Sequence, residues 1–259
     1  MISIRTSIAF FILTLLLSCD PIEREPTDRA DSTQTLAQPT MGYIMPGLDH
    51  GFEQSPINIT SSDSSSNNTH KITLYFNDKI NKIENLGHTV QLDFKNGSTI
   101  TYDDTIFTFK QCHFHTPSEH LIDGITYPME MHIVNVLSTA PKDKPQYLVI
   151  GVLFKEGKEN AFIKDFLNLI PKETDSKVKV KTGTIKLADL FGTIPIELKG
   201  NYYFYRGSLT TPPYTESVRW FITKHIFEAS PEQIEALNAL EGNNARHVQA
   251  LYGRAVQSK

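Results

Sequence analysis

Three histidines in two extended segments are the residues of this sequence best suited to chemistry. His113 and His115 stand one residue apart in a run of β-forming residues, and His132 lies in a second such run, residues 129–137. Side chains alternate faces along a strand, so both imidazoles of the first run emerge on one side. A connection of about a dozen residues can return the chain antiparallel beside the first strand. We therefore expect the three rings to converge.

Three neutral imidazoles at one point are a ligand set for Zn²⁺, with Zn–N bonds of about 2.0–2.1 Å and a fourth tetrahedral position open for water. Gln111 and Glu130 share the faces of the histidines and are placed to hold imidazole N–H groups. Strand histidines can instead be satisfied by hydrogen bonds within a core. Three histidines at compatible spacing with two polar supports favour ligands, which predicts one catalytic zinc ion per chain.

The elements that must position these rings are mostly strands. Runs rich in β-forming residues recur from residue 72 onward, separated by turn signals such as Asn96-Gly97 and Glu156-Gly157. Short antiparallel strands are therefore expected. Two short peripheral helices are predicted over residues 159–170 and 231–240, the second with Ser230 as N-cap. Besides the two histidine runs, the expected strands are 72–76, 89–94, 99–102, 106–109 and 146–154.

The N-terminus is typical of a targeting segment. Residues 1–18 carry one charge, Arg5, and an apolar run too short to span a bilayer, which predicts a cleaved signal peptide. Ser18-Cys19 at the end of that run resembles the lipobox of bacterial lipoproteins, so we expect acylation of Cys19 and a lipid anchor to a membrane. The alternative is an ordinary secretory signal that happens to end near a cysteine. Either way the protein is expected to be exported, to the periplasmic or cell-surface side.

Composition sets the remaining organisation. Residues 19–40 are rich in Pro, Thr and charge and are predicted to be a flexible tether, which leaves residues 41–259 as the folded domain. The chain of 259 residues has 25 Lys+Arg against 29 Asp+Glu and no basic cluster, so a nucleic acid is not an expected partner. With Cys19 acylated, Cys112 has no partner for an intramolecular disulfide. The oligomeric state is not predicted.

Several separated motifs follow one another between about residues 42 and 254: Gln-Ser-Pro-Ile-Asn-Ile at 54–59, Asn-Leu-Gly-His at 85–88, Gln-Cys-His-Phe-His-Thr-Pro-Ser-Glu-His at 111–120, Glu-Met-His at 130–132, Tyr-Arg-Gly-Ser-Leu-Thr-Thr-Pro-Pro at 205–213 and Asn-Asn-Ala-Arg at 243–246. In this order they resemble the motifs of the α-class carbonic anhydrases, in a bacterial lipoprotein form. The resemblance implies a single mainly β domain of α+β character, with a large, twisted, mostly antiparallel central sheet. It also implies a zinc lyase that reversibly hydrates CO₂ to bicarbonate and a proton.

The resemblance assigns roles by residue. Zinc-bound hydroxide would attack CO₂, with Thr210 accepting the hydroxide's hydrogen bond and donating to Glu119. Thr211 would help to position the substrate, and His88 would shuttle the proton. Asn244, in the last motif, would support the metal ligands, and sulfonamide-type or small-anion inhibitors would bind at the zinc. The apolar wall for CO₂ would be formed by Val134, Val149, Leu209, Val218 and Trp220.

Two other functions fit parts of the pattern. A cupin-type iron oxygenase would use His113, His115 and Glu119 as ligands, but the Pro-x-Gly expected shortly before the last histidine is missing ahead of His132. A carbonic-anhydrase-like binding protein without catalysis typically lacks a zinc histidine, and here all three are present. The chain also departs from many relatives at Arg206, where a small residue or proline is common.

Overall fold

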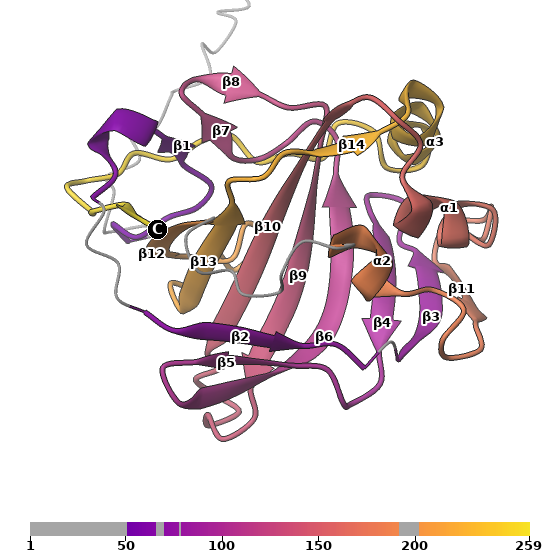
Figure 1. The fold of residues 1–259 in the computed structure, drawn as a ribbon, viewed down its shortest axis with the longest axis horizontal. Helices are drawn as coiled ribbons and strands as arrows, with labels where there is room; N and C mark the ends of the chain where they lie inside the picture. Colours follow the sequence, from indigo (N-terminus) through magenta and orange to yellow (C-terminus); the bar gives the residue numbers. More distant parts are fainter. Residues whose placement is uncertain (1–50, 66–69, 78, 192–201) are drawn as a thin grey trace, which may run out of the picture. The chain divides into compact units, whose positions relative to one another are not determined.

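The histidine-bearing segments lie in the middle of one large twisted sheet (Figure 1). The computed structural model describes residues 51–65, 70–77, 79–191 and 202–259. Its strands are β1 (Asn58–Ile59), β2 (Ile72–Tyr75), β3 (Ile80–Asn85), β4 (Val90–Phe94), β5 (Thr99–Tyr102), β6 (Thr105–His115), β7 (Leu121–Ile122), β8 (Ile125–Thr126), β9 (Met129–Leu137), β10 (Tyr147–Glu156), β11 (Ser176–Lys179), β12 (Tyr202–Gly207), β13 (Val218–Thr223), β14 (Phe227–Ala229) and β15 (Gln257–Ser258). Its helices are α1 (Ala161–Leu167), α2 (Leu187–Phe191), α3 (Pro231–Glu241) and one 3₁₀ turn (Ser61–Asp63).

The central sheet runs in the order β11-β3-β4-β6-β9-β10-β13-β12-β15, with β2, β5 and β14 joined to it at its sides. Strand β10 pairs in parallel with β13 and β14, and the other pairs of this sheet are antiparallel. A small separate sheet has the order β1-β7-β8. The prediction of a mainly β fold with a large, mostly antiparallel sheet and short peripheral helices is confirmed.

The two faces of the central sheet bury different apolar clusters. One face carries phenylalanine, isoleucine and leucine side chains that pack against all three α-helices. Helix α1 contributes Phe162, Ile163 and Phe166, whose spacing is that of an amphipathic helix, and Asn160 caps it by accepting a hydrogen bond from the Ile163 N–H at 3.3 Å. The other face carries the histidines and a second cluster around Trp220. The helices therefore leave the histidine face free for a site.

Both predicted helices exist, although α1 is shorter than the expected 159–170. Helix α3 begins as predicted, with Ser230 and Gln233 forming a reciprocal capping box and Pro231 in the first turn. The strand prediction for residues 129–137 matches β9. The run 205–213, interpreted as a pocket loop, begins inside β12, because Tyr205 continues a pairing with β13.

Strand β6 is longer than expected and changes phase partway along. The runs 106–109 and 111–115 form one strand, with a shift of register between Phe109 and Gln111 opposite β9. Phe107 and Phe109 face the helix-covered cluster, whereas His113 and His115, also odd-numbered, face the other way. The irregularity reverses the side-chain alternation. The first part of β6 therefore contributes side chains to the core, and its last part contributes side chains to the site.

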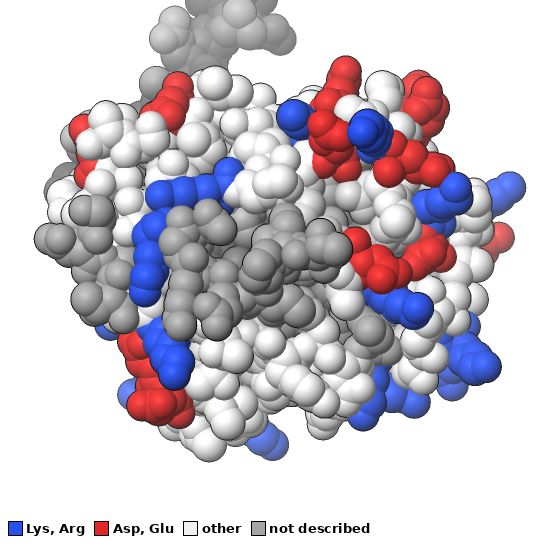
Figure 2. All heavy atoms as spheres, viewed as in Figure 1, with Lys and Arg blue, Asp and Glu red and all other residues white. Residues whose placement is uncertain are grey.

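Charges of both signs are interspersed on the face shown in Figure 2, and no large field of one sign covers the described surface there. Among the described residues, no helix combines the length and apolarity that crossing a membrane requires. The predicted signal peptide, Cys19 and the predicted tether at residues 19–40 lie outside the described residues.

Candidate active site

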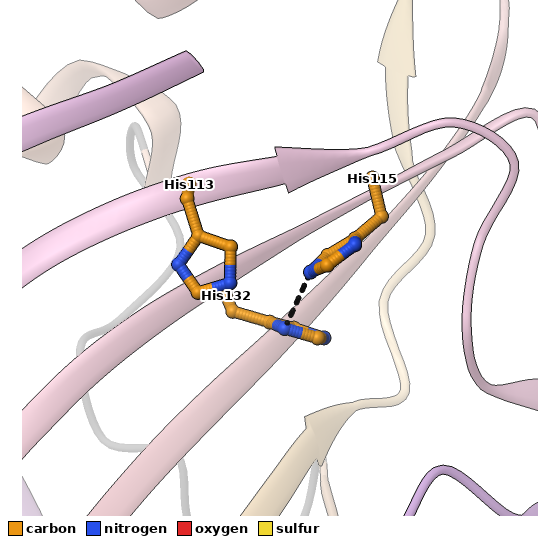
Figure 3. A group of neighbouring side chains, drawn as sticks. All are labelled: His113, His115 and His132. Carbon is orange, nitrogen blue, oxygen red and sulfur yellow. Dashed lines mark hydrogen bonds between the residues drawn. The ribbon is translucent and has the colours of Figure 1, made fainter. Parts of the chain in front are cut away.

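The three predicted ligands meet on one face of the sheet (Figure 3). Antiparallel pairing of β6 with β9 places His113 directly opposite His132, and His115 opposite Glu130. Nε2 of His115 lies 3.1 Å from Nδ1 of His132. One ring nitrogen from each of the three histidines lies within 4.8 Å of the others. The register of two adjacent strands thus produces the convergence that the sequence spacing predicted.

The geometry fits a tetrahedral zinc ion. Two nitrogens bound to one tetrahedral Zn²⁺ at about 2.05 Å would lie about 3.3 Å apart. The separation of 3.1 Å between His115 and His132 is close to that value. His113 is half-buried and the other two are buried, so the set opens to solvent on the His113 side. Three imidazoles and an open fourth direction match a catalytic zinc site better than a closed structural one.

Gln111 and Glu130 hold the outer nitrogens of two of these rings. The Gln111 Oε1 atom lies 2.8 Å from Nδ1 of His113, which places a proton on Nδ1 and leaves Nε2 free to bind a metal. The Glu130 Oε1 atom lies 2.8 Å from Nε2 of His132, which leaves Nδ1 facing the centre. A glycine makes room for this carboxylate, because a Cβ at Gly151 would lie 2.9 Å from the Glu130 Oε1 atom.

The surroundings hold two of the rings neutral. Burial, together with the charges of the neighbouring imidazoles, lowers the pKa of His113 and His115 well below the usual value. Burial also acts to lower the pKa of His132, but the Glu130 carboxylate outweighs it, and the net shift is upward. Burial would raise the pKa of Glu130, but the charges of His120 and His132 hold it well below its usual range. A neutral pair of ligands beside one carboxylate-supported ligand favours a divalent cation.

A second carboxylate lies under the centre. Glu119 is buried, and its Oε1 atom accepts the Arg246 backbone N–H at 2.9 Å. Burial raises its pKa, while His132, the Arg246 N–H and the Thr210 side chain act in the opposite direction. Its Oε2 atom is buried and has no hydrogen-bond partner in the described part of the chain. That oxygen offers an acceptor for the hydroxyl of Thr210, which is itself buried.

His88 lies at the exposed rim of the site. Its positive charge would lower the pKa of His113, which places the two rings within electrostatic reach of each other. The His88 Nδ1 atom lies 2.9 Å from the Leu86 carbonyl, so Nδ1 carries the proton and Nε2 is free to accept one. Gly87 has a φ of +75° and turns the chain sharply before His88. The ring is therefore held on a fixed turn at an exposed position.

Asn244 ties this rim to the ligand strand. Its Nδ2 group donates to the carbonyls of His88 at 2.7 Å and Phe114 at 3.1 Å, and its Oδ1 atom accepts from the Thr116 N–H at 3.1 Å. Phe114 and Thr116 flank the ligand His115 in sequence. Asn244 thus sets the position of His88 relative to the end of β6.

Beside Asn244, Thr116 also contacts the end of helix α3. The Thr116 hydroxyl lies 3.2 Å from Oε1 of Glu241 and 2.9 Å from the Gly242 carbonyl, and both can accept from it. The other Glu241 oxygen accepts the Val90 N–H at 3.3 Å. Burial raises the pKa of Glu241 to about 8. This carboxyl is therefore largely protonated at neutral pH.

The five residues expected to form an apolar wall belong to one cluster on the histidine face. Trp220 packs edge-on against His132, with ring centroids 4.8 Å apart, and its indole N–H donates to the Ser208 carbonyl at 3.0 Å. Thr211 is exposed, next to the buried Thr210. The cluster includes Val149, Val218 and Trp220 as buried members and Val134 and Leu209 as partly buried ones. A small apolar molecule at the histidines would meet this surface.

Sequence reasoning assigned no role to the residues that brace the carboxylates from behind. His120 contacts Oε1 of Glu130 through Nδ1 at 2.8 Å and the Tyr205 hydroxyl through Nε2 at 2.6 Å. The Tyr205 hydroxyl donates to the Ser55 side chain at 2.9 Å. The signal was present in the sequence, since His120 ends the run 111–120 and Ser55 and Tyr205 lie in two of the quoted motifs. Their partners became visible only in three dimensions.

Segments at the two ends of the described chain meet behind the site. Arg246 donates to Oε1 of Gln54 at 3.0 Å and to the Ser55 carbonyl at 2.7 Å, while Arg254 donates to the Gln54 carbonyl at 2.7 Å. The last strand, β15, pairs with β12. The backbone N–H of Arg246 that supports Glu119 is thus fixed by contacts with the other end of the chain.

The structure disfavours the cupin-type ligand set. Two groups of described residues could hold a metal ion, one formed by the three predicted histidines and one by His120, Glu130 and His132. Neither includes Glu119. In the second group, His120 and Glu130 already satisfy each other through a hydrogen bond. The three-histidine group is therefore the better metal site.

Comparison with known proteins agrees with this geometry. The sequence model of the eukaryotic-type carbonic anhydrase family matches residues 45–259. A carbonic anhydrase from Neisseria gonorrhoeae is 38% identical over 210 residues, which cover 80% of this chain and 77% of that protein.

Two solved structures of carbonic anhydrases are also similar to this chain. The α-carbonic anhydrase from Thermovibrio ammonificans, in complex with the inhibitor sulfanilamide, superposes with a TM-score of 0.73 at 35% identity, covering 80% of this chain and 88% of that one. The Photobacterium profundum α-carbonic anhydrase gives a TM-score of 0.72 at 34% identity, covering 82% and 92%. The chain therefore belongs to the eukaryotic-type, or α-class, carbonic anhydrase family, and with it to the enzymes that hydrate carbon dioxide.

Proposed function

We propose that the protein reversibly hydrates CO₂ to bicarbonate and a proton at one Zn²⁺ held by His113, His115 and His132. The observation that carries this proposal is the convergence of three imidazole nitrogens within 4.8 Å, with Gln111 and Glu130 holding the outer nitrogens of two rings. When bound, Zn²⁺ supplies the Lewis acidity that makes water nucleophilic at neutral pH. Metal analysis combined with stopped-flow CO₂ hydration, with and without a chelator, tests the assignment.

The chain's own residues orient the reactants. Thr210 donates its hydroxyl proton to the unpartnered Oε2 of Glu119, so that its oxygen accepts a hydrogen bond from the attacking nucleophile and fixes the lone pair that faces carbon. CO₂ has little to hydrogen-bond and is held by the apolar wall around Val149, Val218 and Trp220. Thr211, at the exposed edge, helps to position substrate and bicarbonate. Sulfonamides and small anions are expected to compete at the same centre.

His88 carries the released proton to solvent. Its Nδ1–H is held by the Leu86 carbonyl, and the free Nε2 accepts a proton relayed through water. We expect His88→Ala to lower turnover about a hundredfold in weakly buffered solution, at the low end of the 10²–10⁴ that a positioned general base contributes. Added imidazole is expected to restore much of the rate. Stopped-flow measurements over a series of buffer concentrations check this.

A matched control is His225→Ala, which removes another exposed histidine that belongs to neither group of described residues able to hold a metal ion. Its turnover should equal that of the wild type at every buffer concentration. An unchanged rate for His88→Ala at low buffer would remove the shuttle role, whatever the control does.

We also propose that Cys19 is acylated after signal cleavage and that the mature enzyme is anchored on the periplasmic or cell-surface side of a bacterial membrane. The support is the small residue and cysteine at the end of the apolar run. Expression of the full chain in a bacterium with a lipoprotein pathway should place it in the membrane fraction. Cys19→Ser should shift it to the soluble fraction, and membrane partition unaffected by this change would defeat the proposal.

A further inference from the structure

Two arginines face each other across strands β12 and β13. Antiparallel pairing sets Arg206 directly opposite Arg219, so both side chains share one face of the sheet. Trp220, the next residue along β13, belongs to the histidine-side cluster, so the arginines lie on the opposite face. The guanidinium of Arg219 lies over the rings of Tyr102 at 5.9 Å and Phe107 at 5.7 Å. This site is therefore separate from the metal centre.

The two positive charges are not neutralised by the described protein. Like charges directly opposite on paired strands are destabilising, and within residues 51–259 as described no carboxylate forms an ion pair with either guanidinium. Burial and the charge of Arg206 lower the pKa of Arg219. The hydrogen bond that Arg219 makes is to the neutral amide oxygen of Gln146, at 3.1 Å.

A cavity of about 200 Å³ adjoins the arginine pair. Besides Arg206 and Arg219 it is lined by Gln146 and by Ser217, whose Oγ atom is buried without a hydrogen-bond partner in the described chain. An unpaired buried hydroxyl is costly unless a ligand or water satisfies it. Guanidinium groups, an amide and a hydroxyl are together the donors that recognise an oxyanion.

The cavity also has an acidic end, formed by Glu53 and Glu216. Glu216 is already engaged there, because its Oε1 atom accepts the Glu53 N–H at 2.6 Å and the Gln54 side-chain amide at 3.0 Å. The charges of both carboxylates act on Arg254. Neither carboxylate is among the groups that shift the pKa of Arg219, on which burial, Arg206 and Tyr102 act instead.

We propose that Arg206 and Arg219, with Gln146 and Ser217, form a binding site for a small oxyanion of the phosphate or carboxylate kind, separate from the metal centre. A dianion would relieve the repulsion between the two guanidiniums. Because the site lies on the other face of β13 from Trp220, its occupant needs no contact with the histidines.

Isothermal titration of the full protein with inorganic phosphate, and separately with acetate, tests this site. Saturating sulfanilamide is present throughout, so that anion binding at the three histidines does not contribute to the measured heat. If the three histidines hold no metal ion, anions do not bind there in any case. We expect a dissociation constant on the order of 1 mM or tighter for at least one of the two anions. Arg206→Gln and Arg219→Gln should each weaken it at least about tenfold, as expected when one of two charge-assisted partners is lost.

Lys155→Gln is the matched control, because it removes one positive charge from an exposed position on β10. Its affinity should stay within about twofold of the wild type. Arg206 is exposed, so Arg206→Gln decides the matter if Arg219→Gln, whose stem packs on two rings, does not fold. Equal binding by wild type and Arg206→Gln, an equal loss in Lys155→Gln, or binding of neither anion would overturn the proposal. The anion whose affinity falls in the arginine variants identifies the ligand as a phosphate or a carboxylate.

Discussion

The His132→Ala variant is expected to lose stoichiometric zinc and to hydrate CO₂ at least about a thousandfold more slowly than the wild type, because the metal provides most of an acceleration that is typically 10⁶-fold or more. His132 is the ligand from β9, and without it the two nitrogens from β6 remain as a weak bidentate site. The substitution also leaves the buried Glu130 carboxylate with His120 as its one remaining imidazole partner among the described residues. Zinc content by atomic absorption and turnover by stopped flow measure the two losses together.

The control for this substitution is again His225→Ala, which should keep one zinc per chain and the wild-type rate. Chelation of the wild type should reproduce the loss of activity, and added Zn²⁺ should restore it in the wild type but not in His132→Ala. Full activity in the variant, or recovery of the chelated wild type with iron instead of zinc, would contradict the three-histidine zinc assignment.

The Glu241→Gln variant is expected to be more stable than the wild type at alkaline pH. The pKa of Glu241 is about 8 in the folded protein, against an ordinary value of 4.5. Between these values the folded state holds a proton that the unfolded state has released, so stability falls as pH rises and levels off above pH 8. At about 1.4 kcal/mol per pKa unit, the wild type should lose about 4 kcal/mol between pH 5 and pH 9 through this group.

Glutamine cannot ionise, and its amide oxygen can still accept from the Val90 N–H while Thr116 donates to the Gly242 carbonyl. Melting temperatures should therefore diverge with pH, with Glu241→Gln about 10 °C above the wild type at pH 9 and the difference mostly gone at pH 5. Glu235→Gln removes a carboxylate from an exposed position on the same helix and should produce no such divergence. A pH-independent difference for Glu241→Gln would show that the carboxyl does not titrate as described.

Much of the metal centre was predictable, because a strand has a fixed alternation and a short connection restricts the return strand. His113 and His115 were expected to share a face, and after a connection of about a dozen residues His132 was expected on an adjacent strand. The shift of register between Phe109 and Gln111 was not predictable, since residues on both sides of it fit a β pattern equally well. The sequence shows this shift only indirectly. Two phenylalanines of β6 that face the core and the two histidines that face the site all stand at odd-numbered positions, although they need opposite environments.

Contacts between distant segments set the limit of prediction. Glu119 is held by the backbone N–H of Arg246, a group that every residue except proline has, so no side-chain pattern reveals it. The raised pKa of Glu241 likewise depends on burial in the folded chain, which outweighs the opposing hydrogen bonds from Val90 and Thr116, both far away in the sequence. Strands β12 and β13 were not predicted. Their residues had been assigned to a pocket because they resemble a family motif, and the alternation of their side chains was not considered.

The contacts of Gln54 and Ser55 with Arg246 and Arg254 also impose an order on biosynthesis. The stretch that positions Glu119 leaves the ribosome after most of the sheet has been translated. A nascent chain can pair its early strands but cannot fix the Glu119 carboxylate in place until residues 246–254 have left the ribosome. Glu119 therefore gains this support only once the segment that carries Arg246 and Arg254 has been made.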